Sequence, residues 1–273
     1  MKLAFSLLLK DEPATTELLD AIRLAGFDGV EPTFALEGSL PSAASYQKSA
    51  ERLRQTVAQS SLSISSMRGG PGFWPTFASP DAAKRKSAIE LAEKAFEALK
   101  ITGGDTLLIV PGQWDANQTY AQTWTNAIET AKRIGEIAER AKINVGLENV
   151  ENKFLLSPRD WMAFLDEVAM PRVKMYFDVG NVVYMRQGYS EQWIRELGRK
   201  YITRIHFKDS QVGGPINYLL EGAVNWPGVT SAMKEVGYDD WVGIELNLPA
   251  HHPEAMLASQ CKAARMILKG GAS

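Results

Sequence analysis

Residues 144–148 read NVGLE, a short apolar run that ends in a carboxylate. Similar runs follow later in the chain, namely KMYFD at 174–178, TRIHF at 203–207 and VGIEL at 242–246. Each run is apolar without strict alternation, as expected of parallel strands covered on both faces. Each also carries an acid or a histidine at or next to its end. The pattern predicts a parallel sheet with polar groups gathered at one edge.

Four further apolar runs precede residue 144 and are separated by segments of helical period. The predicted strands are Lys2–Leu7, Gly29–Glu31, Ser63–Met67, Thr106–Val110, Asn144–Glu148, Lys174–Asp178, Thr203–Phe207 and Val242–Leu246. A serine followed by a proline predicts a capped helix start at Ser79 and again at Ser157. Glycines at Gly26 and Gly237 are expected to end helices.

Eight strands interleaved with helices predict an α/β protein, a (β/α)8 TIM barrel that forms a single domain over residues 1–273. The main competitor is an open, doubly wound sheet, whose nucleotide-binding form needs a glycine-rich turn after an early strand. The segment Gly26–Gly29 lacks that spacing, and Gly69–Gly72 matches no nucleotide fingerprint. We interpret the second glycine-rich segment as a flexible loop.

Composition excludes several classes of protein. The chain has 273 residues, 45% of them apolar, with a net charge of -2 and a pI of about 6.0, so we expect no nucleic-acid partner. The single cysteine, Cys261, lies in an apolar helical pattern and is expected to be a buried thiol in a reducing compartment. The apolar start at Met1–Leu9 is followed directly by Lys10–Pro13 without a cleavage site, which favours a first strand over a signal peptide. We therefore expect a cytoplasmic protein without a membrane partner.

Ionisable residues occur at the predicted carboxyl ends of six strands, where barrel enzymes carry their catalytic groups. They are Glu31, Arg68, Glu148, Asp178, His206 and Glu245. The last four lie on successive strands at intervals of 30, 28 and 39 residues, about one βα unit each. One such carboxylate alone could cap a helix or pair with a lysine. Four in succession predict a metal site, because unpaired charges in apolar strands cost several kcal/mol.

The donor set defines which cation we expect. Three carboxylates and one imidazole suit Mn2+ first, with Mg2+, Co2+ or Zn2+ as alternatives, and do not match the sulfur-rich pattern of structural zinc. Octahedral coordination by four protein groups would leave two positions for substrate oxygens. A ketose could fill them with its carbonyl and the adjacent hydroxyl, and the cation would then stabilise an enediolate.

Several motifs resemble one known superfamily over nearly the whole chain. They are Ala25–Glu31 (AGFDGVE), Gly146–Asn149 (GLEN), Tyr176–Asn181 (YFDVGN), Ile205–Asp209 (IHFKD), Glu221–Trp226 (EGAVNW) and Gly243–Leu246 (GIEL). On these motifs the chain resembles the xylose-isomerase-like TIM-barrel superfamily of sugar phosphate isomerases and epimerases. Within it, the resemblance points to the ketose 3-epimerase and the hexulose- or xylulose-phosphate epimerase branches.

The resemblance implies a metal-dependent ketose 3-epimerase or aldose–ketose isomerase that acts on a small sugar or sugar phosphate. Both reactions pass through an enediolate, and C3 of a ketose is the favoured position. The resemblance also implies that Glu148 and Glu245 are both metal ligands and the acid/base pair, standing on opposite faces of the substrate carbon. Asp178 and His206 would be ligands alone. Relatives of this kind form dimers or tetramers, so a homo-oligomer is expected.

One position departs from many members of the superfamily, which place a histidine three residues after the strand-six aspartate. Here that residue is Asn181, which can bind a hydroxyl but cannot shuttle a proton. The full set of predicted substrate-binding residues is Glu31, Arg68, Trp114, Asn181 and Lys208.

Neighbouring segments extend this set. Trp114 is expected to form an aromatic wall together with Phe73-Trp74-Pro75, and Arg68 to contact a phosphate or distal hydroxyl together with Gln211–Gly214. Asp209, next to Lys208, is a further candidate for holding the substrate or the ligands.

Three other functions remain to be weighed. An inosose-type dehydratase or lyase would use the same metal site. A DNA-repair endonuclease on this fold needs many more histidines than His206, His251 and His252. A non-catalytic sugar-binding barrel is disfavoured because both Glu148 and Glu245 are present.

Overall fold

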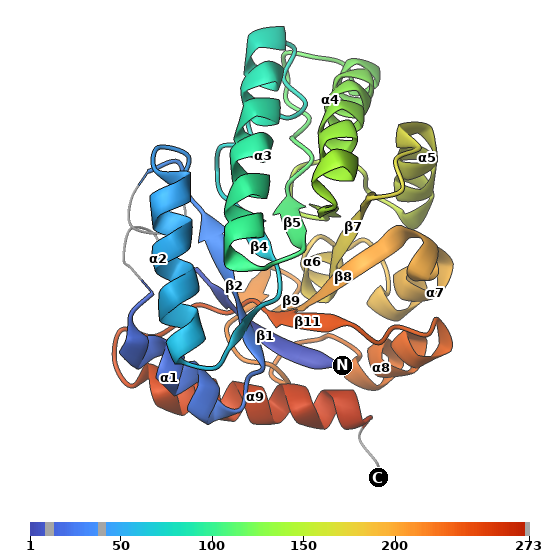
Figure 1. Ribbon diagram of the computed structural model, residues 1–273. Helices are drawn as coiled ribbons and strands as arrows, with labels where there is room; N and C mark the ends of the chain where they lie inside the picture. The colour runs from blue at the N-terminus through green and yellow to red at the C-terminus, as the bar shows by residue number, and fades with distance from the viewer. Residues whose placement is uncertain (9–13, 38–41, 271–273) are drawn as a thin grey trace.

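The computed structural model describes residues 1–8, 14–37 and 42–270, which form a closed barrel of parallel strands (Figure 1). The strands follow one another around the barrel in chain order. They are β1 (Lys2–Leu7), β2 (Gly29–Phe34), β3 (Ser63–Ile64) with β4 (Met67–Gly69), β5 (Thr106–Ile109), β6 (Asn144–Glu148), β7 (Val173–Asp178), β8 (Ile202–Phe207) and β11 (Trp241–Ile244). The barrel closes because β1 pairs in parallel with both β2 and β11. The predicted (β/α)8 TIM barrel is confirmed.

Helices surround the barrel, except for the short α6 (Val179–Tyr184), which directly follows β7 at the barrel mouth (Figure 1). They are α1 (Thr16–Ala25), α2 (Tyr46–Gln59), α3 (Ala82–Thr102), α4 (Tyr120–Ala141), α5 (Pro158–Val168), α6 (Val179–Tyr184), α7 (Ser190–Tyr201), α8 (Trp226–Glu235) and α9 (Pro253–Lys269). Every residue of β2 and β8 is buried, as expected of strands that contact the barrel interior on one face and helices on the other. No helix within the described ranges combines the length and apolarity needed to cross a membrane.

The third strand position differs from the prediction. Instead of one strand over Ser63–Met67, the chain forms β3 and β4 with Ser65 and Ser66 between them. Both serine side chains are buried and bond to β2, Ser65 Oγ to the Val30 carbonyl and Ser66 Oγ to the Glu31 carboxylate. These side-chain bonds hold the chain beside β2 where the strand is interrupted.

Gly69 corrects our interpretation of the glycine-rich segment as a flexible loop. It is the last residue of β4 rather than part of a loop. A Cβ at this position would lie 2.6 Å from the Leu108 carbonyl oxygen of β5. The glycine is therefore required by close packing of two strands.

Helix ends follow the predicted signals with one correction. Ser157 caps α5 and Pro158 is its first residue, while Gly26 ends α1 with a φ of 100°. At the start of α3, however, the cap is Asp81, whose carboxylate accepts a hydrogen bond from the Ala83 N–H at 2.8 Å. Asp81 rather than Ser79 is therefore the N-cap, and the helix begins two residues later than predicted.

A short hairpin follows β8 and is anchored by a buried carboxylate. Its strands are β9 (Asp209–Gln211) and β10 (Gly214–Ile216), which pair antiparallel. The Asp209 carboxylate is fully buried and accepts hydrogen bonds from the Leu220 N–H at 2.9 Å and the Trp226 indole N–H at 3.0 Å. Asp209 therefore fixes the chain that leaves the barrel mouth after β8.

Replacing Asp209 by alanine would leave both of these N–H groups without an acceptor. Because an unpaired buried donor costs about 1–3 kcal/mol, we expect Asp209→Ala to lower the free energy of unfolding by about 2–4 kcal/mol in urea denaturation. Asp239→Ala is the matched control, since Asp239 is exposed and pairs with the N-terminal amine, a type of pair worth about 0–1 kcal/mol. Equal losses in the two variants would contradict the anchoring role.

Candidate metal centre

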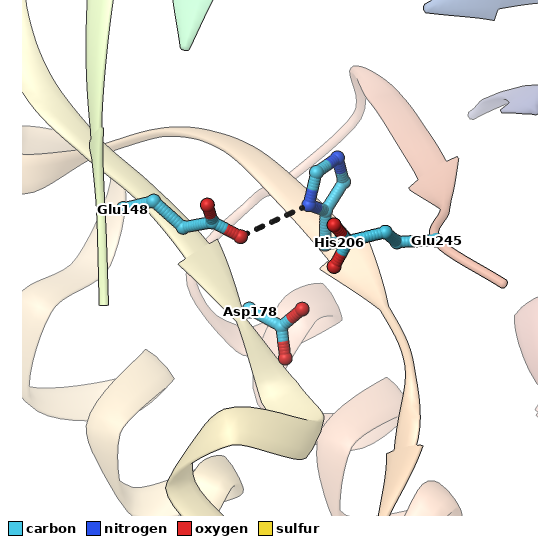
Figure 2. Close-up of side chains that lie close together, drawn as sticks. All are labelled: Glu148, Asp178, His206 and Glu245. Carbon is cyan, nitrogen blue, oxygen red and sulfur yellow. Dashed lines mark hydrogen bonds and ion pairs between the residues drawn. The ribbon is translucent and has the colours of Figure 1, made fainter. Parts of the chain in front are cut away.

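The four predicted metal ligands meet at the carboxyl-terminal mouth of the barrel (Figure 2). Glu148 ends β6, Asp178 ends β7, His206 lies one residue before the end of β8, and Glu245 directly follows β11. Strand pairing sets Asp178 and Gly243 on either side of His206. One oxygen or nitrogen atom from each of the four ligands lies within 4.8 Å of all the others. The structure therefore gathers the four side chains around one point.

The chemistry of this cluster fits a divalent cation. All four side chains are buried, with Asp178 and His206 fully so. Asp178 Oδ2 is buried and accepts no hydrogen bond from any residue that the structure describes. Three carboxylates at this separation repel one another, and a buried charge without a partner is costly. A divalent ion would supply the missing charge, and three oxygens with one nitrogen are suitable ligands for it.

Lys208 provides part of the charge compensation within the protein. Its ammonium group contacts Glu245 Oε2 and lies 3.4 Å from Asp178 Oδ2 and 3.4 Å from Asn181 Oδ1. Burial lowers the pKa of this ammonium, but the carboxylates of Asp178, Glu245 and Glu148 outweigh burial and hold the pKa above its usual value. Lys208 therefore stays charged beside the cluster.

Arg68 approaches the same cluster from β4. Its guanidinium lies 3.5 Å from Glu245 Oε1. Burial raises the pKa of the Glu245 carboxyl, but Lys208 and Arg68 outweigh burial and hold that pKa well below its usual range. Glu245 is therefore ionised at neutral pH.

Asp178 behaves in the opposite way. Burial raises the pKa of its carboxyl to about 6, and the carboxylates of Glu245 and Glu148 add to this effect while Lys208 opposes it. A proton on Asp178 would relieve the repulsion within the cluster. The same proton must leave before Asp178 can bind a metal ion.

Glu31 lies next to the cluster, on the Nε2 side of His206. Its carboxylate is fully buried and bonds to His206 Nε2 at 2.9 Å, Ser6 Oγ at 2.9 Å, Ser66 Oγ at 2.5 Å and Tyr176 Oη at 2.6 Å. Burial raises the pKa of Glu31, but His206 and the hydroxyl donors outweigh it and lower the pKa to about 2. Both oxygens are bonded to protein groups and Glu31 does not line the cavity at the barrel mouth, so the structure does not place Glu31 at the predicted substrate contact.

Asn149 is a residue that sequence reasoning missed. Its side chain donates to the Asp178 carbonyl at 2.9 Å and accepts from the Asp178 N–H at 2.8 Å, which joins the ends of β6 and β7. Asn181 donates its side-chain N–H to the Asn149 carbonyl at 2.8 Å and its backbone N–H to Asp178 Oδ1 at 2.7 Å. The sequence offers one signal for this role: Asn149 directly follows Glu148 at the end of a predicted strand.

A cavity of about 260 Å³ opens above the cluster. Glu148, Glu245, Asn181, Lys208 and Arg68 all line it. A molecule in this cavity could therefore contact the predicted acid/base pair and three of the predicted substrate-binding residues.

Two other predicted contacts lie away from the cavity. Trp114 packs edge-on against Tyr120 with ring centroids 5.4 Å apart and does not belong to the cavity lining, whereas Trp74 does. The Gln211–Gly214 segment forms the turn of the β9–β10 hairpin and is also absent from the lining. Of the residues predicted for the aromatic wall, Trp74 lines the cavity, whereas the Trp114 indole N–H donates to the Gln118 carbonyl at 3.0 Å.

A family model described as "Xylose isomerase-like TIM barrel" matches residues 19–265. The chain belongs to this family. The match covers β2 to β11 and therefore includes all four residues of the cluster.

Two curated relatives of this xylose isomerase-like protein match more weakly. A putative L-ribulose-5-phosphate 3-epimerase of Haemophilus influenzae is 24% identical over 196 residues, which cover 71% of this chain and 68% of the relative. An uncharacterised protein of Methanocaldococcus jannaschii is 25% identical over 171 residues, covering 59% of this chain and 57% of the archaeal protein.

Solved structures share the fold over the full chain. The IolI protein, crystallised with a bound zinc atom, has a TM-score of 0.82 and 18% identity, with 100% of both chains covered. D-psicose 3-epimerase from Clostridium cellulolyticum H10, solved with D-tagatose, has a TM-score of 0.75 and 18% identity, covering 100% of this chain and 93% of the other. These similarities establish a common architecture.

The raised pKa of Asp178 predicts how metal affinity changes with pH. Below about pH 6 the Asp178 carboxyl holds a proton that competes with the cation, so the affinity for Mn2+ should rise between about pH 5 and pH 7. Competition with a chelator of known affinity at each pH would measure this. Glu151→Gln, which changes a carboxylate of the cavity wall outside the cluster, should leave the profile unchanged. A constant affinity across this range would contradict the assignment of Asp178.

Proposed function

We propose that this protein is a divalent-metal-dependent isomerase that epimerises a ketose, or a ketose phosphate, at C3. The observation that carries the proposal is the placement of Glu148 and Glu245. They extend toward the cluster from opposite sides (Figure 2), from strands separated by β7 and β8, and both line the cavity. This is the arrangement required of a base on one face of a carbon atom and an acid on the other.

Epimerisation removes the proton on the carbon next to a carbonyl and returns a proton to the opposite face. One glutamate takes the first proton as a carboxylate, and the other, protonated, donates the second. Lys208 and Arg68 keep Glu245 ionised, so Glu245 is ready to act as the base when the substrate binds. In the reverse reaction the two glutamates exchange roles.

A bound cation would act as a Lewis acid on the substrate carbonyl and adjacent hydroxyl and would stabilise the negative charge of the enediolate. Glu148, Asp178, His206 and Glu245 would hold it. Their donor set favours Mn2+, with Mg2+, Co2+ or Zn2+ as alternatives. The zinc atom in the IolI crystal structure supports a divalent ion on this fold.

Substrate contacts are proposed for three residues of the cavity wall. Asn181 and Lys208 lie beside Asp178, where they would bind substrate oxygens next to the reacting carbon. Arg68 would bind an oxygen further along the sugar. The epimerase names of the structural and curated relatives support a sugar substrate.

The two glutamates should be essential for turnover. In a screen of ketoses and ketose phosphates with Mn2+, we expect Glu148→Gln and Glu245→Gln each to lower kcat at least about 100-fold, because each removes one proton transfer. Glu151→Gln is the control, since Glu151 lines the same cavity without belonging to the cluster. It should retain activity close to that of the wild type.

Running the wild-type reaction in deuterated buffer identifies the chemistry. NMR should detect deuterium at one carbon of the recovered ketose, as proton exchange requires. An unsaturated product would instead identify a dehydratase or lyase. Full activity in metal-stripped protein would contradict the proposed mechanism.

A further inference from the structure

The two ring nitrogens of His206 face different carboxylates. Nδ1 points into the ligand cluster and lies 3.4 Å from Glu148 Oε1. Nε2 points away from the cluster and lies 2.9 Å from Glu31 Oε1. Both His206 and Glu31 are fully buried, so water does not compete for either contact. The orientation of the ring thus decides which nitrogen reaches the cation.

Glu31 is held in one position by three hydroxyl groups from different parts of the barrel. Ser6 of β1 donates to Oε1, while Ser66 and Tyr176 of β7 donate to Oε2. With His206, the carboxylate has four donors and no freedom to rotate without losing several of them. It is therefore a fixed acceptor aimed at His206 Nε2.

Packing holds the imidazole plane at the same place. The Tyr176 ring lies against His206 with ring centroids 4.4 Å apart. On another side, a Cβ at Gly243 would lie 2.6 Å from His206 Cδ2. The absence of a side chain at Gly243 therefore leaves room for the ring, and Tyr176 packs against it.

We infer that Glu31 is a positioning residue for the metal centre. It accepts the proton of His206 Nε2, and this bond fixes the tautomer that offers the Nδ1 lone pair to the cation. A ligand histidine whose second nitrogen is held in this way is both oriented and made a stronger donor. The inference rests on the metal centre proposed above and gives Glu31 a role there in place of a substrate contact.

NMR of zinc-loaded protein with 15N-labelled histidine tests the inference directly. Zinc is suitable because it is diamagnetic, and the chain has only three histidines, His206, His251 and His252. We expect the spectrum of His206 to contain a proton on Nε2 and a metal-bound Nδ1. A proton on Nδ1 with a metal-bound Nε2 would overturn the inference.

The zinc affinity of two Glu31 variants tests whether Glu31 orients His206. Glu31→Leu removes the acceptor and should raise the zinc dissociation constant about 10–100-fold. Replacing the hydrogen-bond partner of a metal-binding histidine has an effect of this size. Glu31→Gln keeps an oxygen for Nε2 and should recover most of the affinity. Glu191→Leu, which removes a buried carboxylate that accepts from the Asn225 side chain and belongs neither to the cluster nor to the cavity wall, is the matched control and should bind zinc as the wild type does.

The outcomes are distinguishable. Wild-type affinity in Glu31→Leu would overturn the inference and leave the metal centre intact. Failure of the wild-type protein to bind zinc, Mn2+ or another divalent ion would remove the proposed function and the inference with it. If Glu31→Leu does not fold, the spectrum of the wild-type protein and the affinity of Glu31→Gln still decide the question.

Discussion

The site is governed by repulsion among three carboxylates that the closed barrel brings together. Glu148, Asp178 and Glu245 lie with His206 within 4.8 Å of one another and are shielded from water. Two cationic side chains, Lys208 and Arg68, reach the cluster but leave Asp178 Oδ2 without a hydrogen bond. A divalent cation would complete such an arrangement, and in the proposed function it would also supply the Lewis-acid chemistry of the site.

The carboxyl groups in and around this centre differ in pKa, because each has different charged neighbours. Glu245 lies next to both cationic side chains and is held ionised, whereas Asp178 has a pKa of about 6 because burial and two carboxylates disfavour its charge. Glu31, which contacts His206 Nε2, keeps its charge through His206 and three hydroxyl donors. In the proposed function the three carboxylates would therefore have different roles: Glu245 would act as a base, Asp178 would bind the cation after losing its proton, and Glu31 would orient His206.

Much of this was readable from the sequence, because the pattern of apolar runs fixes the strand order and the strand order fixes which side chains converge. The four predicted metal ligands, which the structure brings together, are found in this way from the ends of four successive strands. Contacts made by loops are different, since no sequence period determines them. Trp74 and Trp114 each follow a predicted strand, and the sequence does not distinguish them. In the structure Trp74 lines the cavity, whereas Trp114 does not and instead donates a hydrogen bond to the Gln118 carbonyl. Likewise, a strand residue such as Glu31 carries no sequence signal for its depth below the barrel mouth.

The central claim is that one cation binds where four named side chains meet. A crystal of the protein grown with Mn2+ and measured at the manganese absorption edge tests it most directly. The account predicts a single anomalous peak at about 2.0–2.3 Å from oxygens of Glu148, Asp178 and Glu245 and from Nδ1 of His206. An empty cluster in the presence of excess Mn2+, or a peak bound elsewhere on the chain, would contradict it.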